Sequence, residues 1–212
     1  MDNYLVVLAD LVGSRSVPAR GPLQEWFARG VDELNSRFQS LIVSPLTVTL
    51  GDEFQGVLRS AGHLFQLVHQ MQLHLWERFP DLDIRFVFGV GGIDTALNRK
   101  SAIGMDGPAF HFARETMEKV KSEDLRFGIS SEDPEIELLD TLCHWIDINI
   151  AQWKHHRIAL LYHHRRGSTQ VTMEKMLGIS QPAISQNITR PDFQAVLRSE
   201  LTVEKYLSGM LR

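Results

Sequence analysis

Two aspartates lie in short loops where acidic side chains could bind a divalent cation. Asp10 follows the apolar run Tyr4–Ala9, and Asp52 lies in the turn at residues 51–53. A strand end and a hairpin tip can meet at one edge of a sheet, where carboxylates bind cations such as Mg²⁺ or Mn²⁺. Two such ions about 3.5–4 Å apart can clamp the attacking and leaving oxygens in phosphoryl transfer. Spacing alone leaves open that each aspartate is only a turn residue.

The residues that follow Asp10 could hold phosphate groups. Backbone N–H groups around Val12, Gly13 and Ser14 could form a nest for anions, with Gly13 allowing close approach of the chain. Glu53, beside Asp52, is interpreted either as a third acidic ligand or as an outward-facing hairpin residue. These loops are therefore the candidate site for chemistry.

Charge divides the chain into an acidic body and a basic C-terminal part. Residues 1–150 hold 13 of the 22 Lys and Arg residues and 22 of the 26 Asp and Glu residues, a net charge of −9. Residues 151–212 hold 9 basic and 4 acidic residues, a net charge of +5. A basic segment behind an acidic body suggests a nucleic-acid-binding module.

Within this basic part, the segment Val171–Arg190 predicts two short helices joined by a tight turn. A first helix, from about Thr172 to Leu177, is expected to end at Gly178, which suits the left-handed conformation of a helix exit. Ser180 can cap a second helix that begins at Gln181. In the helix-turn-helix plan, the second helix enters the major groove of DNA and reads bases with its N-terminal residues.

The polar side chains of this segment are candidates for two kinds of DNA contact. Amide and hydroxyl groups on the second helix can read base edges, and the candidates are Gln181, Ser185, Gln186 and Asn187. Basic groups can contact phosphates, and the candidates are Arg165, Arg166, Lys175 and Arg190. An ordinary helical hairpin packed in a core is the alternative interpretation.

Apolar periodicity predicts the elements that position these residues. Strands are expected at residues 4–9, 46–50, 54–58, 84–90 and 126–129, and helices at residues 21–41, 62–79, 107–120 and 135–166. This order predicts an α+β fold, a sheet with helices on one face. The expected division is an α/β domain at 1–134, a helical connector at 135–166 and a small all-α domain at 167–212.

Composition excludes several classes of protein. The chain has 212 residues, of which 43% are hydrophobic and 23% charged, as is typical of a folded globular protein. Its apolar runs are far shorter than the roughly 20 residues that cross a bilayer. The single cysteine, Cys143, cannot form an internal disulfide and is predicted to lie in the core. The N-terminus carries no signal-peptide pattern, so we expect a cytoplasmic protein that does not enter a membrane.

Four segments resemble the class III nucleotidyl cyclases in the same order. ADLVGSR at 9–15 is similar to their first-strand motif, and VTLGDEFQGVL at 48–58 to their hairpin motif. RFVFGVGGI at 85–93 and AIGMDGPAFHFARE at 102–115 resemble the next strand and the helix of transition-state residues. GDEF is also similar to the diguanylate cyclases, which share the palm-like fold. With the helix-turn-helix, nearly the whole chain resembles the SatD family, which implies a ferredoxin-like, cyclase-like palm domain followed by a helix-turn-helix domain.

The cyclase resemblance implies roles for residues of the candidate site. Asp10 and Asp52 would be the catalytic carboxylates and the ligands of Mg²⁺ or Mn²⁺. Arg114 would steady the charge on a transferring phosphate. The positions implied to contact the metal or the phosphates through their backbone are Leu11, Val12, Gly13, Ser14 and Gly51.

Two positions depart from these families. Cyclases carry an asparagine four residues before the arginine, where this chain has Phe110, which cannot donate a hydrogen bond to the substrate. Leu50 replaces a glycine of the diguanylate cyclase hairpin. Both departures weaken the prediction of a cyclisation reaction.

Three functions remain open. The first is a DNA-binding regulator whose cyclase-like domain binds a divalent metal and a nucleotide, either a nucleoside triphosphate or a signalling nucleotide. The second is an active nucleotidyl cyclase or nucleotidyltransferase, and the third is a degenerate scaffold that binds only DNA or protein. Phe110 favours the first over the second, and the pair Asp10 and Asp52 favours it over the third. A homodimer is expected, because helix-turn-helix proteins commonly bind half-sites about 34 Å apart.

Overall fold

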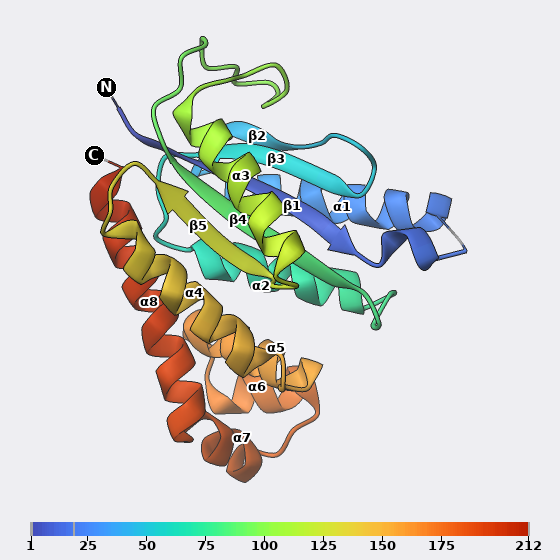
Figure 1. Cartoon of the computed structure of the whole chain (residues 1–212). Coiled ribbons are helices and arrows are strands. Elements are labelled where there is room, and N and C mark those ends of the chain that lie inside the picture. The colour runs from blue at the N-terminus through green and yellow to red at the C-terminus, as the bar shows by residue number, and fades with distance from the viewer. Residues whose placement is uncertain (1, 19, 212) are drawn as a thin grey trace.

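The computed structural model describes residues 2–18 and 20–211, which form an α+β protein with a five-stranded mixed sheet and eight α-helices (Figure 1). The strands are β1 (Tyr4–Val12), β2 (Ile42–Val48), β3 (Glu53–Leu58), β4 (Asp83–Gly91) and β5 (Phe127–Ser131). The helices are α1 (Arg20–Arg37), α2 (Leu64–Trp76), α3 (Pro108–Ser122), α4 (Ile136–Ile150), α5 (His155–Arg165), α6 (Gln170–Leu177), α7 (Gln181–Ile188) and α8 (Pro191–Met210). The predicted α+β class is confirmed at this level.

The sheet has the strand order β2-β3-β1-β4-β5, with β1 at its centre. β1 is antiparallel to both neighbours, and its residue Leu5 pairs with Leu58 of β3 and with Val90 of β4. β5 runs parallel to β4 at the edge. The central place of β1 follows from its sequence, because a nearly continuous apolar run is stable where both faces of a strand are covered.

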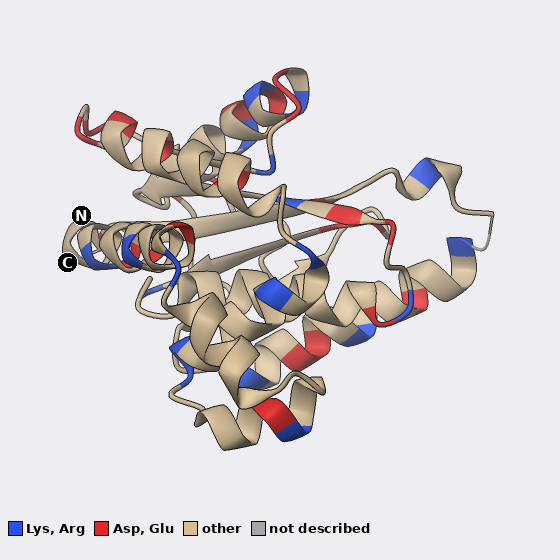
Figure 2. Cartoon of the chain, turned by 90° about the horizontal axis from the view of Figure 1, so that it is seen from below, with Lys and Arg blue, Asp and Glu red and all other residues tan. Residues whose placement is uncertain are grey.

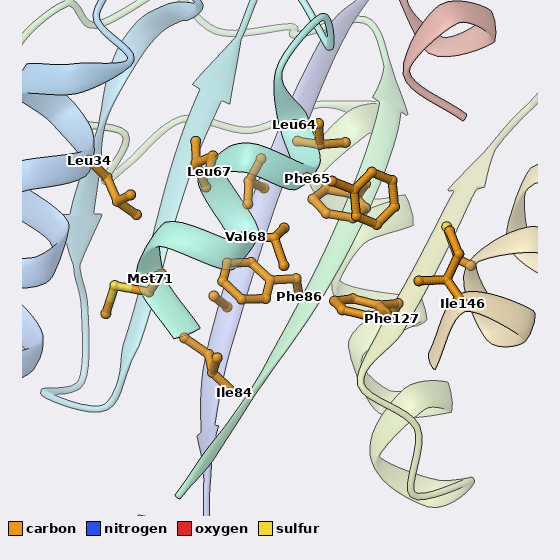
Figure 3. Close-up of a cluster of buried hydrophobic side chains, with 14 of the residues drawn as sticks. Leu34, Leu64, Phe65, Leu67, Val68, Met71, Ile84, Phe86, Phe127 and Ile146 are labelled. Atoms are coloured by element: carbon orange, nitrogen blue, oxygen red, sulfur yellow. The ribbon is translucent and has the colours of Figure 1, made fainter. Parts of the chain in front are cut away.

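One face of the sheet packs against α1 and α2. Alternate residues of β1, such as Leu5 and Val7, belong to a large core with apolar residues of these helices. Figure 3 shows part of this core, in which Phe65 and Val68 of α2 lie beside Phe86 of β4. The helices predicted at residues 21–41 and 62–79 from their apolar spacing are therefore confirmed as α1 and α2, and the apolar positions form their buried sides.

The opposite face of the sheet is covered by α3, which corrects the expectation of helices on one face only. The intervening strand residues Val6 and Val87 form a second cluster with Phe110 and other residues of α3. This packing needs a glycine on β4, because a Cβ at Gly89 would lie 2.0 Å from the carbonyl oxygen of Ala109. The sheet is thus enclosed between two layers of helices (Figure 1).

The segment predicted to be mostly helical at residues 135–166 consists of two helices, α4 and α5. Between them the chain turns, and Lys154 adopts an extended conformation before α5 begins. The turn places the Trp153 ring in a stack with Phe193 of α8, at 5.7 Å between centroids, and beneath the guanidinium of Arg157. The apolar pattern of residues 135–166 therefore extends over two helices and the turn between them.

The apolar core continues from the sheet into the C-terminal helices. The same cluster that contains Val7 and Phe86 also contains Ile158, Ile184 and Phe193. The division at residues 134/135 and 166/167 stays a prediction. Cys143 is fully buried, as expected. No helix in the described ranges is long and apolar enough to cross a membrane.

Candidate functional site

The structure brings the end of β1 and the β2–β3 hairpin together. Asp10 is paired with Glu53 across β1 and β3, so the two side chains lie on the same face of the sheet. The N–H of Leu11 donates to the carbonyl oxygen of Asp52 at 2.9 Å. The Ser14 hydroxyl donates to Asp52 Oδ2 at 2.7 Å. Three carboxylates, which we call the acidic edge (Asp10, Asp52 and Glu53), therefore lie near one another, and they include Glu53, which the sequence left open as a third acidic residue of the site.

The glycines of both loops adopt the left-handed conformation. Gly13 has φ 78° and precedes a short 3-10 helix at Ser14–Ser16, and Gly51 has φ 83°. These are backbone angles that residues with a Cβ rarely adopt. The Ser16 N–H and hydroxyl both bind the carbonyl oxygen of Gly13, at 3.0 and 2.7 Å. Leu50, the departure from the diguanylate cyclase pattern, is exposed beside Gly51. Phosphate binding by these loops stays a prediction.

Basic side chains already face the acidic edge. Lys121 Nζ lies 3.3 Å from Asp10 Oδ2 and 3.8 Å from Glu53 Oε1. Arg20 Nη2 lies 3.8 Å from Asp52 Oδ2. Burial raises the pKa of Glu53, the charge of Asp10 adds to that rise, and Lys121 opposes it. Glu53 is thus close enough to Asp10 and Asp52 to be repelled by both charges, and side chains of α1 and α3 partly neutralise the acidic edge.

A cavity of about 200 Å³ lies beside the acidic edge, between α3 and strands β1 and β3. Its lining includes Glu53 and Gln55 from the sheet and Arg114 and Lys121 from α3. It is smaller than the roughly 300–1,000 Å³ of typical small-molecule sites, so it suits one end of a nucleotide rather than the whole. Arg114, which the resemblance assigns to a phosphate, therefore shares a cavity with one carboxylate of the acidic edge.

Two contacts define the surroundings of Arg114. Its Nη1 lies 3.2 Å from Asp106 Oδ1, and its guanidinium lies 5.8 Å from the ring centroid of Phe110. Phe110 itself is fully buried in the cluster between α3 and the sheet. The position where cyclases carry an asparagine thus contributes to the core and cannot offer a hydrogen bond to a ligand.

The acidic edge does not form a metal site in its present arrangement. Carboxylate oxygens are the donors that Mg²⁺ and Mn²⁺ prefer. Within residues 2–18 and 20–211, however, no three His, Cys, Asp or Glu side chains are grouped so as to hold a metal ion. The oxygens of Asp10 and Asp52 face Lys121, Arg20 and Ser14 instead. Binding of a divalent cation by these aspartates stays a prediction, and it needs a rearrangement of their partners.

In the C-terminal part, the two helices and the turn predicted at Val171–Arg190 are confirmed. α6 ends at Gly178, which has φ 65°, and α7 begins after Ser180. Thr169, which the sequence interpretation missed, caps α6 by accepting a hydrogen bond from the Thr172 N–H at 3.1 Å. Met173 of α6 and Ile184 of α7 are buried in the core that continues from the sheet, so the pair is firmly anchored.

The predicted DNA-contacting residues differ in their exposure. Four of them are exposed, namely Arg166, Lys175, Gln186 and Arg190. Three others are partly buried and lie on α7, namely Gln181, Ser185 and Asn187. The amide of Gln181 donates to Glu174 Oε2 at 2.6 Å, and that of Asn187 to the carbonyl oxygen of Ala183 at 2.9 Å. Gln186 is therefore the best-placed amide for contact with a base edge. Acidic and basic positions are interspersed along the helices (Figure 2).

Arg165 does not lie on the surface, which corrects its prediction as a phosphate contact. Its side chain is 2% exposed, and its guanidinium bonds to Glu200 and, at 2.6 Å, to Glu204 Oε2, both on α8. The run of basic residues at the end of α5 does not indicate that Arg165 is buried. The helix that covers its side chain is α8, which begins 26 residues later in the sequence. Arg165 instead joins α5 to α8.

Around Arg165 lies a buried charged network, which we define as His69, Arg165, Glu200 and Glu204. His69 Nε2 of α2 is 2.7 Å from Glu200 Oε1, and the Phe65 N–H donates to Glu204 Oε1 at 2.9 Å. Burial raises the pKa of Glu204 to about 7. Burial alone would also raise the pKa of Glu200, but His69 and Arg165 outweigh it and lower that pKa. The sequence analysis missed this network. The signal that could have indicated it is the spacing of Glu200 and Glu204, which lie four residues apart on the apolar face of α8.

Together these features define a class of protein: an α+β protein with an acidic edge on its sheet, packed onto C-terminal helices through a shared core. The SatD family matches residues 4–204 of the chain. The chain belongs to the SatD family, as its sequence motifs indicated. A search of curated proteins finds no match.

Proposed function

We propose that this protein is a DNA-binding regulator whose cyclase-like α/β part binds a nucleotide. The observation that carries the proposal is the arrangement of α6 and α7. Their apolar side chains Met173 and Ile184 are buried in the core, while Gln186 of α7 faces outward. A short helix held in this way after a tight glycine turn can enter the major groove of DNA.

The exposed residues around α7 suit this role. Gln186 would read a base edge, since an amide can form two hydrogen bonds with adenine. Lys175, Arg166 and Arg190 would contact phosphates on either side and fix the register of α7. Arg165 has no part in this surface, because it lies in the buried charged network.

The order of the first four strands supports a ferredoxin-like palm for the α/β part. Residues 4–91 run β1-α1-β2-β3-α2-β4, and their strands lie in the order β2-β3-β1-β4 with antiparallel neighbours. This succession is that of the β-α-β-β-α-β motif. In such a domain, the end of the first strand and the following hairpin would form the ligand site, which is where the acidic edge lies.

Nucleotide binding is proposed for the cavity between α3 and the sheet. Arg114 and Lys121 line it together with Glu53 and Glu118, and the two basic side chains are the groups that could bind the phosphate end of a nucleotide. Phe110 is buried and offers no polar group to the ligand. Binding without conversion therefore fits the site better than cyclisation. Mg²⁺ or Mn²⁺ would accompany the phosphates only if the partners of the acidic edge move.

A homodimer is part of the proposal, because one α7 reads only one half-site. Exposed apolar side chains on α4 support such pairing. Leu138 is 71% exposed, Ile148 60% and Trp145 41%, and they recur at helical spacing on the outer side of α4. An exposed apolar stripe of this kind often marks a contact with another chain.

DNA binding is tested by selecting bound sequences from a random duplex pool with the purified full chain. We expect an enriched site, and we expect Gln186→Ala to lose about 1–3 kcal/mol of discrimination at one base pair while keeping non-specific affinity. Gln39→Ala, which replaces an exposed glutamine outside the C-terminal helices, is the matched control and should select the wild-type site. Absence of any enriched sequence, or identical selection by Gln186→Ala, would contradict the assignment of α7.

A further inference from the structure

Two arginines from distant parts of the chain meet at one buried hydroxyl group. Arg37 is the last residue of α1, and Arg166 follows directly after α5. Nη1 of Arg37 donates to the Tyr162 hydroxyl oxygen at 2.8 Å, and Nη1 of Arg166 donates to the same oxygen at 3.0 Å. The two guanidinium groups are therefore only two hydrogen bonds apart, although one belongs to the α/β part and the other to the C-terminal helices.

The tyrosine that holds these two arginines is itself fixed in place. The Tyr162 side chain is buried, and its O–H donates to Oε1 of Gln70 on α2. Arg37 donates to the same Gln70 oxygen. Because the hydroxyl proton is directed to Gln70, the hydroxyl oxygen can accept from both arginines. Three helices thus share one hydrogen-bond network, which we call the tyrosine junction (Arg37, Gln70, Tyr162 and Arg166).

The tyrosine junction holds two positive charges and no negative one. Within residues 2–18 and 20–211, no carboxylate forms a salt bridge with Arg37 or Arg166. By contrast, Arg157 at the start of α5 pairs with Asp192 at 2.8 Å. Burial lowers the pKa of His163, and the charges of Arg166 and Arg37 lower it further. The surface around the junction is therefore electropositive, and an anion there would relieve the repulsion between the two arginines.

A purely structural role explains only part of this arrangement. Each arginine lies at the C-terminal end of a helix, where a positive charge is favourable. That preference does not bring two such ends onto one hydroxyl with no carboxylate between them. Both side chains are exposed, and their Nε and Nη2 groups make no hydrogen bond within the described ranges. Phosphate is the anion that suits these free donors, because a guanidinium can bind it through two parallel N–H groups.

The place of the tyrosine junction indicates which phosphate would meet it. Residues 167–169 link Arg166 to α6, and within this link the Ser168 N–H donates to the carbonyl oxygen of His163 at 3.1 Å. The link is thus folded against α5, which holds the junction beside the start of α6. In a helix-turn-helix complex, the first helix of the pair crosses the DNA backbone while the second enters the groove. A duplex bound by α7 would therefore carry its backbone past the start of α6 and the junction.

We propose that Arg37 of α1 binds a DNA phosphate together with Arg166, so that the α/β part forms one edge of the DNA-binding surface. The inference rests on the proposed function, since it extends the surface around α7. Tyr162 is a positioning residue in this proposal, because it holds both guanidinium groups and touches no DNA itself. DNA binding by this chain then depends on how the α/β part sits against the C-terminal helices.

The test is fluorescence anisotropy with the full chain and the selected duplex over a range of salt concentrations. Arg37→Met should weaken binding about tenfold at low salt and reduce the slope of log affinity against log salt by about 1. The selected sequence should not change, because a phosphate contact carries no sequence information. Arg29→Met is the matched control, because Arg29 is an exposed arginine on the same helix outside the tyrosine junction. It should bind DNA like the wild type.

Ethylation interference identifies the phosphate itself. Ethylation of the phosphate bound by the two arginines should block binding of the wild type. The same ethylation should interfere less with Arg37→Met and not at all with Arg37→Met combined with Arg166→Met, while interference at the other phosphates stays the same. This pattern reports contact with DNA, which a change in stability would not alter at one phosphate alone.

Further variants separate charge from position. Arg37→Lys should keep the wild-type salt slope, since lysine also neutralises a phosphate. Tyr162→Phe keeps both charges but removes the shared hydroxyl, so it should weaken binding with little change in salt slope. Arg37→Gln replaces Arg37→Met if the circular dichroism spectrum of the latter is altered, and it should give the same loss of slope.

The possible failures are distinguishable. A salt slope and an interference pattern equal to those of the wild type in Arg37→Met would overturn the phosphate contact and leave DNA binding by α7 intact. Weaker binding by Arg37→Met with an unchanged slope and pattern would also overturn it, because Arg37 would then only support the fold. If the wild type selects no DNA sequence and binds no duplex, both this inference and the proposed function fail.

Discussion

Replacing Arg165 by methionine removes the cation from the buried charged network. Glu200 and Glu204 both bond to Arg165, and their side chains are 0% and 5% exposed. Removal of one partner from a buried ion pair typically costs about 3–5 kcal/mol, because the other charge stays buried without compensation. Since domains have a total stability of about 5–15 kcal/mol, we expect Arg165→Met to remove a large part of the free energy of unfolding.

The loss should depend on pH in a definite direction. In the wild type, the pKa of Glu204 is raised from 4.5 to about 7, so its contribution to stability is complete below pH 4.5 and is lost as pH rises through about 7. Without Arg165, the carboxylates of Glu200 and Glu204 lose their positive neighbour and hold protons more tightly. The destabilisation by Arg165→Met should therefore be larger near pH 8 than near pH 5.5.

The assay is urea unfolding followed by circular dichroism, at about pH 5.5 and about pH 8. Arg166→Met is the matched control, because Arg166 is the exposed residue directly after α5 and its side chain donates to the Tyr162 hydroxyl at 3.0 Å. We expect it to change the free energy of unfolding by less than about 1 kcal/mol at both pH values.

Two results would refute this reasoning. One is a loss below about 1 kcal/mol for Arg165→Met near pH 8, which would mean that Arg165 is not essential to a buried network. The other is a stable Arg165→Met protein with weakened DNA affinity, which would restore Arg165 to the surface role suggested by the sequence.

Two further predictions concern α3 and the DNA surface. Gly89→Ala should lower the free energy of unfolding in urea by about 3 kcal/mol or more, because the new Cβ would lie 2.0 Å from the carbonyl oxygen of Ala109. Gly62→Ala is the control. Its Cβ would meet no atom closer than 3.5 Å, so this variant should have nearly the stability of the wild type. Lys175→Ala should weaken binding to all DNA sequences and reduce the slope of log affinity against log salt by about 1 in fluorescence anisotropy. An unchanged salt slope would exclude Lys175 as a phosphate contact, and a stable Gly89→Ala protein would contradict the close packing of α3.

Local signals allowed much of the fold to be predicted. The apolar run Tyr4–Ala9 indicates a covered strand, and β1 lies at the centre of the sheet. Gly178 ends α6 because glycine tolerates the left-handed exit, and Ser180 precedes α7 as predicted, although its side chain makes no capping hydrogen bond. The sequence also indicated that Asp10 and Asp52 lie close together, although Asp10 lies inside β1, which continues to Val12, rather than in a loop after it.

The features that were missed depend on contacts between distant segments. The turn between α4 and α5 brings Trp153 against Phe193 of α8, a contact that no local pattern reveals. Arg165 belongs to a basic run, yet Glu200 and Glu204 of α8 draw it into the interior. Lys121 meets the acidic edge only because α3 packs on the second face of the sheet, which the expectation of helices on one face excluded.

We propose that a nucleotide bound by the α/β part of this regulator changes the affinity of the C-terminal helices for DNA. The most direct measurement is fluorescence anisotropy with the selected DNA site, with and without each nucleoside triphosphate and Mn²⁺. We predict that one nucleotide shifts the dissociation constant of the wild type for DNA. The same nucleotide should leave the dissociation constant of Asp52→Asn for DNA unchanged. DNA affinity that no nucleotide alters, or equal shifts in the two proteins, would contradict the claim.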